Sequence, residues 1–269
     1  MPYITKTLIS SEGCDASHDK RLSICLLADG FSFAQLSMDG ELLSFCEAAG
    51  QHSSSMTDMT RDLMAYFAEM GVRPLAFRSM SLTLISNESV WVPDEVYQVG
   101  SNRHYMRLVG GSGQSLMTAQ CPSLASTAVF SYNDQLPTAF KVALPGLNVA
   151  NQHVRFAALA QQFNGGTVLL SYWRNGYVDL AAYRNGQYVF GNTIPFADES
   201  TALFLLIDAM KSYGVESEGT SLLMCGDVSR ERYARFRPYF PTVSLFSGVA
   251  KAGARFRTFH AYRHALTLV

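Results

Sequence analysis

The stretch TVLLSYWRNGYVDLAAYRNGQYVF, residues 167–190, decides the fold of this chain. It holds three apolar runs that are separated by two Asn-Gly pairs, Asn175-Gly176 and Asn185-Gly186. Both residues of an Asn-Gly pair tolerate a positive φ, and the twist of the resulting two-residue turn suits a hairpin. The stretch therefore predicts a three-stranded antiparallel meander.

The same arrangement occurs earlier in the chain. Residues 22–46, LSICLLADGFSFAQLSMDGELLSFC, carry Asp29-Gly30 and Asp39-Gly40. Each of these turns lies 146 residues upstream of its counterpart in the later stretch. Because the two pairs also share their internal spacing, the pattern indicates an internal duplication.

Each half continues in the same order after its meander. In the first half an amphipathic helix is predicted at residues 59–70 and an apolar strand at residues 80–85. In the second half Asp198 is expected to cap a helix that is apolar on most sides over residues 203–210, and a strand follows at residues 222–225. Pro93-Asp94 and Ser229 are expected to open a second helix in the respective halves. The chain thus predicts an α/β protein that repeats strand–strand–strand–helix–strand–helix.

The division into domains follows from the repeat. A Gly/Ser-rich connection, residues 110–126, and two predicted strands, 127–132 and 139–144, separate the halves, and Pro145-Gly146 breaks the chain. We expect a polar lead-in, residues 1–21, a first subdomain, 22–145, and a second subdomain, 146–269. A chain of 269 residues is long enough to bury two cores of this size.

Composition indicates a cytoplasmic protein that does not insert into a membrane. The chain is 48% hydrophobic and 16% charged, and no apolar run approaches the roughly 18 residues that span a bilayer. The N-terminal residues lack the basic-then-apolar order of a secretory signal. The five cysteines are scattered and form no C-x-x-C pair, as expected for reduced thiols.

Charge is spread unevenly. Residues 227–269 hold eight Lys/Arg and two acids, whereas the rest of the chain holds 13 bases and 20 acids. The basic side chains that alternate with aromatic ones are Arg230, Arg232, Arg235 and Arg237. Such a pattern fits single-stranded nucleic acid, but it also fits a helix with one packed face, and the excess charge could attract the acidic remainder of the chain.

The repeat, the segments RLSICLLADGFSFAQL (21–36) and YNDQLPTAFKVALPG (132–146), and the basic closing segment resemble an uncharacterised bacterial domain of unknown function with an actin-like ATPase fold. The resemblance covers about residues 20–265. It implies an α/β fold of two ribonuclease-H-like subdomains around a cleft, each with a three-stranded meander followed by helix–strand–helix. Adapter proteins of pilus and secretion systems share this fold, and in them binding of a protein partner matters more than catalysis.

The resemblance also implies a nucleotide site on three loops at the cleft. Asp29-Gly30 and Ser32 match the first phosphate loop, although the acid abuts the glycine instead of preceding it by a residue. Arg174-Asn175-Gly176 match the second, where a cation stands in place of the metal-binding carboxylate. Gly226-Asp227 match the adenosine loop, with one glycine where two are expected. Asp179 is expected to lie about 13 Å along the strand from Asn175, too far to replace the missing acid.

These departures weaken the case for ATP and magnesium. Magnesium is held through carboxylates and substrate phosphates, and phosphoryl transfer depends on it. With one acid displaced and the other absent, we expect no hydrolysis, no catalytic residue and no bound metal, while Arg174 remains able to attract a phosphate.

Other motifs favour structural explanations. Asp29-Gly30 suits a hairpin turn for backbone reasons alone, and a glycine after a buried strand, as at Gly226, commonly just ends it. The glycine-rich run 110–115 lacks the lysine of a phosphate-binding loop. His260 and His264 share a helical spacing but have no third ligand in the sequence.

The sequence therefore predicts a non-catalytic binding or scaffold protein on a degenerate actin-like frame. One alternative is a nucleotide-binding protein with vestigial ATPase activity. Another is an RNA-associated factor that uses the basic C-terminal segment.

Overall fold

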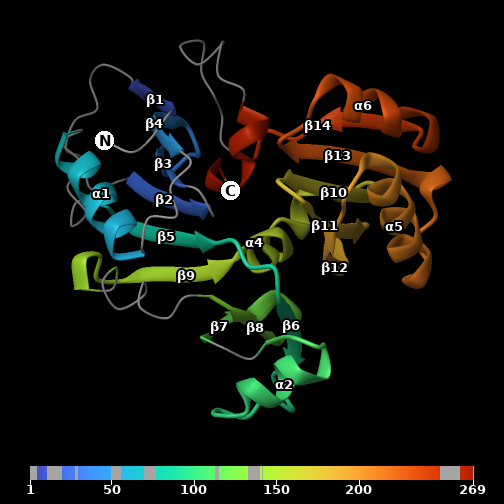
Figure 1. Ribbon diagram of the computed structural model, residues 1–269, viewed down its shortest axis with the longest axis horizontal. Coiled ribbons are helices and arrows are strands. Elements are labelled where there is room, and N and C mark those ends of the chain that lie inside the picture. Colours follow the sequence, from blue (N-terminus) through green and yellow to red (C-terminus); the bar gives the residue numbers. More distant parts are fainter. Residues whose placement is uncertain are drawn as a thin grey trace.

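The computed structural model describes residues 5–10, 20–27, 30–49, 56–69, 77–112, 115–132, 140, 142–248 and 261–268. Two large mixed sheets lie side by side, and a small antiparallel sheet hangs below the first of them (Figure 1). Among the described residues, no helix is long and apolar enough to cross a membrane.

The second sheet contains the predicted meander of residues 167–190. Its strands, in spatial order, are β12 (Gln187–Pro195), β11 (Tyr177–Arg184), β10 (Thr167–Arg174), β13 (Thr220–Gly226) and β14 (Thr242–Leu245). The first three pair antiparallel, and β13 and β14 then add in parallel. Asn185 and Gly186 both have positive φ, 51° and 78°, as a primed hairpin turn requires.

The first sheet repeats this order. Its strands are β1 (Thr5–Ser10), β4 (Leu42–Ala49), β3 (Gly30–Ser37), β2 (Lys20–Leu27), β5 (Ser79–Leu84) and β9 (Leu147–Asn151). From β4 to β9 the pairing directions match those of the second sheet, so the duplicated α/β fold is confirmed. The added edge strand β1 lies within residues 1–21 and pairs antiparallel with β4.

The repeat is less regular than the turn spacing suggests. β2 and β10 begin 147 residues apart, as do β3 and β11. The offset between these equivalent strands is therefore one residue larger than the offset of 146 between the glycines of the equivalent turns. Asp39-Gly40 lies within the four-residue connection from β3 to β4, whereas Asn185-Gly186 forms the whole two-residue turn from β11 to β12. The strands are therefore duplicated, and the turns have diverged.

Helices cover one face of each sheet. The helix α1 (Met56–Glu69) packs Phe67 edge-on against Phe33 of β3, with ring centroids 4.8 Å apart. On the second sheet lie α5 (Glu199–Ser212) and α6 (Arg230–Phe236) (Figure 1). As expected, Asp198 and Ser229 cap these two helices by accepting hydrogen bonds from backbone N–H groups of the first turn.

An insertion between β5 and β9 sets the first half apart. It contains β6 (Ser89–Pro93), α2 (Asn102–Leu108), β7 (Leu116–Cys121), the 3-10 turn η2 (Pro122–Leu124) and β8 (Ser126–Ser131). The expected helix at Pro93-Asp94 was wrong, because Pro93 ends β6 and β6 pairs with β8. Helix, strand and helix thus follow one another directly in the second half, whereas in the first half the insertion comes after the strand β5.

The predicted strand at residues 139–144 was also wrong. Residues 140, 142 and 143 are helical, and the Leu144 N–H donates to the Phe140 carbonyl, 2.7 Å away. Phe140 and Leu144 are both fully buried. Their separation by four residues places them on one face of a helical turn, and this tertiary burial outweighs the strand propensity of the run.

Two segments join the halves. The helix α4 (Gln152–Ala158) directly follows β9 and contacts β5 and β9 of the first sheet as well as β11 and β12 of the second. The 3-10 segment η7 (Ala261–Leu268) contacts β2, β3 and β13 and lies between the two sheets (Figure 1). Residues 147–151 complete the first sheet, although the expected boundary at residue 146 assigns them to the second subdomain.

The remaining short turns are 3-10 helices in the second half. They are η3 (Ala160–Gln162), η4 (Ser217–Gly219) and η5 (Arg237–Tyr239). Arg237 thus follows α6 in a 3-10 turn that contains Pro238, as a proline that ends a helix predicts.

Candidate functional site

The first expected phosphate loop lies against the C-terminal segment. Asp29 lies outside the described residues, while Gly30 and Ser32 belong to β3 and are buried. The hydroxyl oxygen of Ser32 is 2.6 Å from that of Thr267 in η7. The hydroxyl group of Ser32 is therefore already hydrogen-bonded to a side chain of the same molecule.

The segment η7 fills the space next to this strand. Ala265 and Leu266 pack in one apolar cluster with Cys25 of the first sheet and with Tyr172 and Cys225 of the second. Burial raises the pKa of the Cys25 thiol to about 12, so this cysteine stays protonated in the cluster.

The end of the same segment covers the first sheet. Leu268 packs with Ala34, Leu36, Leu42 and Phe45 in a separate cluster. The described end of the chain therefore packs along β3, the strand that also holds Gly30 and Ser32.

The second expected phosphate loop carries an ion pair. Arg174 donates from Nε to Asp179 Oδ2 at 2.7 Å and from Nη2 to Asp179 Oδ1 at 3.1 Å. Asp179 was expected to lie too far along the strand from Asn175 to replace the missing acid. The hairpin folds β11 back along β10 and pairs Asp179 with Tyr172, two residues before Arg174. The guanidinium then spans the short remaining distance, and its charge is neutralised by a carboxylate with 0% side-chain exposure.

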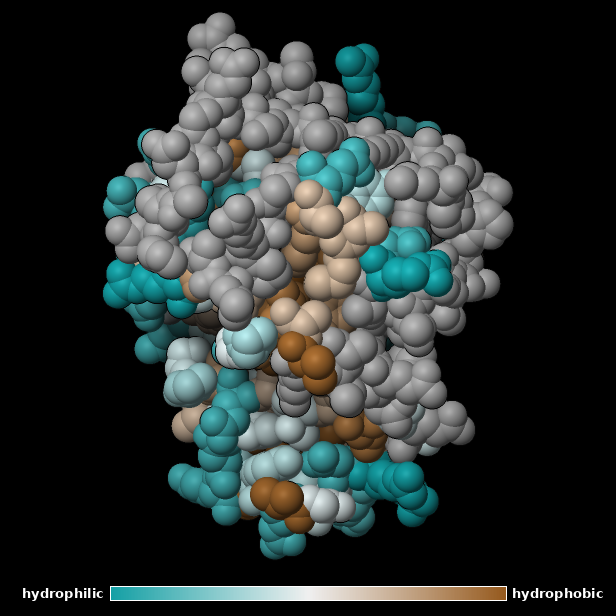
Figure 2. Space-filling view, turned by 90° about the vertical axis from the view of Figure 1, so that its left-hand side faces the viewer, coloured by the Kyte–Doolittle hydropathy of each residue, from teal (hydrophilic) through white to brown (hydrophobic). Residues whose placement is uncertain are grey.

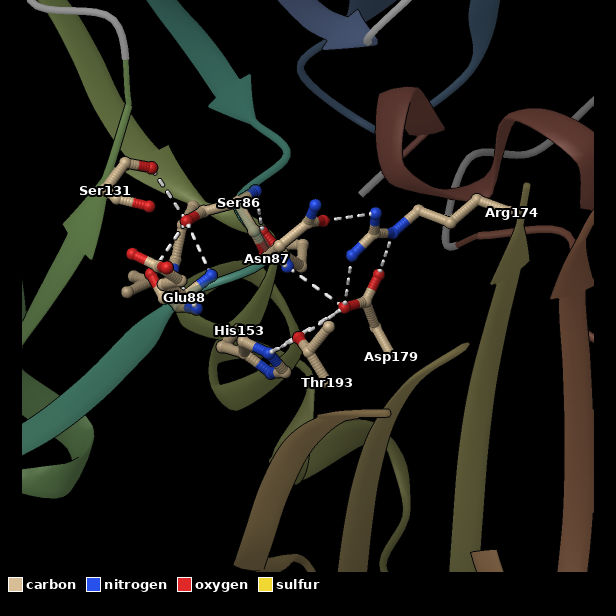
Figure 3. A network of polar contacts seen from close by, with 11 residues as sticks. Ser86, Asn87, Glu88, Ser131, His153, Arg174, Asp179 and Thr193 are labelled. Carbon is tan, nitrogen blue, oxygen red and sulfur yellow. Dashed lines mark hydrogen bonds and ion pairs between the residues drawn. The ribbon is translucent and has the colours of Figure 1, made fainter. Parts of the chain in front are cut away.

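Asp179 is the centre of a polar network that joins both sheets, called here the Asp179 network (Figure 3). Its Oδ1 also accepts from Thr193 Oγ1 at 2.6 Å and from Gln152 Nε2 at 3.0 Å. Gln152 in turn donates to the Ser86 carbonyl at 2.6 Å and accepts from the Ser86 N–H at 3.0 Å. A buried carboxylate needs such charge-assisted donors to offset its lost hydration.

Arg174 extends the network to the start of the insertion. Its Nη1 donates to Asn87 Oδ1 at 2.6 Å, two residues before β6. The guanidinium also lies 4.7 Å from the ring centre of Tyr177. Asn175 and Gly176 form the adjoining turn, in which Gly176 has φ 72°. The cation that the sequence places in the metal position is thus bound to protein groups on several sides.

His153 borders the network as a neutral side chain. Its Nε2 lies 2.8 Å from Thr193 Oγ1 and 3.9 Å from Asp179 Oδ1. Because the single Thr193 proton goes to the acceptor-only carboxylate, His153 Nε2 carries its proton and donates to Thr193. Its buried Nδ1 has no hydrogen-bond partner. Burial lowers the pKa of His153; Asp179 opposes this shift and Arg174 adds to it.

This lowered pKa predicts a loss of stability in mild acid. An unfolded histidine has a pKa near 6.5, so below that pH the unfolded chain binds a proton that the folded chain excludes. We expect the free energy of unfolding to decrease as pH falls from about 7 to about 5.5, with a shallower decrease in His153→Gln. Urea titrations across this range measure both slopes, and equal slopes would rule out a role for His153.

The third expected loop, Gly226-Asp227, is used for strand packing. Gly226 pairs with Trp173 across β13 and β10 and has φ 83°. A Cβ atom there would lie 2.2 Å from the Trp173 carbonyl oxygen. The Asp227 N–H donates to that same oxygen at 2.8 Å. Only a residue without a Cβ atom allows the backbone of β13 to approach Trp173 of β10 this closely.

One of the basic side chains is a structural residue. Arg232 pairs with Glu199, 2.7 Å from Nη2 to Oε1, and also donates to the Asp227 carbonyl. Its guanidinium lies 4.5 Å from the Trp173 ring centre, and the side chain is 11% exposed. Arg232 of the basic segment is thus bound to an acid in the remainder of the chain. This agrees with the interpretation that the excess positive charge of residues 227–269 attracts the acidic remainder.

The other basic residues differ in their surroundings. Arg230, Arg235 and Arg237 are exposed, and Arg235 donates to Ser200 Oγ at 2.9 Å. Lys251, Arg255, Arg257 and His260 lie outside the described residues.

Metal-binding groups do not gather in the described part of the chain. No cluster of three or more His, Cys, Asp or Glu side chains could hold an ion there. His264 lies 3.6 Å from Glu47 and its ring centre is 4.6 Å from that of Phe45, so it is part of the packing of η7. At the turn where a second phosphate loop was expected, the donor set does not fit magnesium, because the carboxylate of Asp179 already binds the Arg174 cation.

Sequence reasoning missed most of the Asp179 network. Gln152 and His153 are buried at the start of α4, whereas Thr193 is half-buried in β12, and no sequence spacing links these two elements to Asp179. One local signal was available: the polar run Asn151-Gln152-His153 follows an apolar strand directly and opens a helix.

Comparisons with known proteins agree with the observed fold. A Bacteroides thetaiotaomicron protein with an actin-like ATPase fold and unknown function superposes with a TM-score of 0.70 at 15% identity, over 87% of this chain and 93% of that one. A chain of the PilM–PilN type IV pilus biogenesis complex superposes with a TM-score of 0.54 at 10% identity, over 92% and 96%. The chain therefore has an actin-like ATPase fold. No curated protein matches it. Residues 12–243 match the DUF3822 family of proteins of unknown function, and the chain belongs to this family.

Proposed function

We propose that this protein is a non-catalytic binding or scaffold protein on a degenerate actin-like frame. The observation that carries the proposal is the ion pair of Arg174 with the fully buried Asp179. Where the resemblance expects a metal-binding carboxylate, this chain has the cation of Arg174, and the carboxylate of Asp179 already neutralises its charge. Asp179 is not free to bind a metal ion or to orient an attacking water at this position. If its carboxylate moved, Arg174 would lose its counter-charge and two further donors would lose their acceptor.

The packing of η7 supports the same proposal. The hydroxyl groups of Thr267 and Ser32 are hydrogen-bonded to each other, and Leu266 is buried among residues of both sheets. Phosphates that entered along β3 would have to displace this segment and expose its apolar side chains to water. The free-energy cost of displacing η7 would weaken the binding of phosphate by the same amount.

We further propose that the ligand of this frame is another protein and that it acts in the cytoplasm. Support comes from the PilM chain of the PilM–PilN complex, which shares the fold and is part of an assembly with a protein. Nucleic acid is the less favoured ligand, because Arg232 is bound to Glu199 and to the Asp227 carbonyl.

The nucleotide test separates a scaffold from an ATPase. We expect no magnesium-dependent ATP hydrolysis and no change in melting temperature with ATP and magnesium. A true site filled at 100 times its dissociation constant would stabilise the fold by about 2.7 kcal/mol, which a thermal melt resolves.

Two aspartates provide the matched variants for this test. Asp29→Ala removes the acid of the expected first phosphate loop, and Asp39→Ala removes the equivalent acid of an exposed turn. A magnesium-dependent melting shift and turnover that are lost in Asp29→Ala but kept in Asp39→Ala would refute the proposal.

A further inference from the structure

The outer end of the insertion exposes an unusual amount of apolar surface. Of the ten large hydrophobic side chains exposed among the described residues, four lie within residues 96–109. These four, called here the apolar tip, are Val96 (59% exposed), Val99 (92%), Leu108 (71%) and Val109 (53%). Figure 2 shows apolar residues among hydrophilic ones at the lower end of the molecule, where the insertion lies.

The other faces of the insertion are covered. On β8, Val129 packs with Met106 of α2 on one side of the small sheet. Ala128 and Phe130 point the other way and join the core of the first subdomain. The apolar tip thus lies at the end of α2 and in the loop before it, and no described part of the chain covers it.

The apolar tip is held in place rather than left to collapse. The Tyr105 hydroxyl donates to the Val96 carbonyl and accepts from the Gln98 N–H, both at 2.9 Å. The rings of Tyr97 and Tyr105 stack with centroids 6.0 Å apart. A loop fixed in this way loses little conformational entropy on binding, so its exposed valines are ready for a partner.

The charges around the apolar tip are of both signs. Glu95, Arg103 and Arg107 are exposed, and none of them has a charged partner within the described chain. Arg103 and Arg107 are four residues apart and therefore share a face of α2. A surface that holds apolar side chains with both an acid and two bases can complement itself, which an isologous dimer requires.

We propose that the apolar tip is the dimerisation surface of this protein and that its partner is a second copy of the chain. Two-fold symmetry would bury the valines and leucines of the two copies against each other. It would also set Glu95 of each copy against the α2 bases of the other. This proposal goes beyond the proposed scaffold function and does not depend on it.

Sedimentation measured over a series of protein concentrations tests the apolar part. We expect the wild type to dimerise with concentration, and Val99→Asp to weaken the dimer at least tenfold. The matched control is Phe204→Asp, which puts the same charge on an exposed apolar position of α5, outside the insertion. Its dimerisation should equal that of the wild type.

A charge exchange tests the self-complementarity. Glu95→Arg alone, and Arg103→Glu with Arg107→Glu alone, each set like charges against each other twice per dimer, so both should be more monomeric than the wild type. Mixed together, the two variants restore an attractive contact at both places, and the mixture should dimerise again. A second partner class, such as an acidic peptide, would not produce this rescue.

Two results would overturn the proposal. One is a wild type that stays monomeric at every concentration. The other is Val99→Asp dimerising as well as Phe204→Asp, which would place the interface elsewhere. Circular dichroism of each variant confirms that the fold is intact before the comparison.

Discussion

Asp179→Ala should lower the free energy of unfolding by about 3–5 kcal/mol, as removal of one member of a buried ion pair does. The substitution leaves the Arg174 guanidinium, which is 17% exposed, without its counter-charge. It also removes an acceptor from the buried Gln152 and from the half-buried Thr193. Urea denaturation followed by circular dichroism measures the loss.

Two further variants make this measurement specific. Asp208→Ala removes an exposed carboxylate from α5 and should change the stability by no more than about 0.5 kcal/mol. Arg174→Ala combined with Asp179→Ala should cost little more than Asp179→Ala alone, because both remove the same interaction. If Asp179→Ala cost as little as Asp208→Ala, the Asp179 network would not hold the two sheets together.

Gly226→Ala should be strongly destabilising for a steric reason. The new Cβ would lie 2.2 Å from the Trp173 carbonyl oxygen and 2.9 Å from its nitrogen, and backbone atoms of a central strand cannot move aside. The left-handed backbone alone costs about 1–2 kcal/mol for a residue with a side chain. The contact with Trp173 adds to this cost.

Gly214→Ala is the matched control for the backbone contribution. Gly214 has φ 65°, but a Cβ there would meet nothing within 4 Å. The difference in unfolding free energy between the two alanine variants therefore isolates the contact with Trp173. Equal losses in urea denaturation would show that Gly226 is needed only for its φ, and the close approach of β13 to β10 would carry no energetic weight.

Much of the fold could be predicted because its signals are local. Asn185-Gly186 favours a hairpin through the positive φ of both residues, and Asp198 and Ser229 mark helix starts through their side-chain oxygens. The failures occur where tertiary contacts decide. The burial of Phe140 and Leu144 turns a strand-like run into a helical turn.

The site was harder to predict because its contacts cross elements. The sequence predicts that Arg174 lies next to a hairpin turn, but only the antiparallel register of β10 and β11 brings Asp179 to it. Ser86, which follows β5, is hydrogen-bonded to Gln152 of α4, 66 residues further along the chain. Thr267 reaches Ser32 over 235 residues, a distance at which no sequence pattern of a single chain indicates contact.

A crystal structure grown with magnesium and a saturating non-hydrolysable ATP analogue tests the central claim most directly. We predict that Arg174 remains bound to Asp179, that Thr267 remains on Ser32, and that no nucleotide lies between the two sheets. A nucleotide bound there with a magnesium ion, with η7 displaced from β3 and Arg174 turned away from Asp179, would contradict the account.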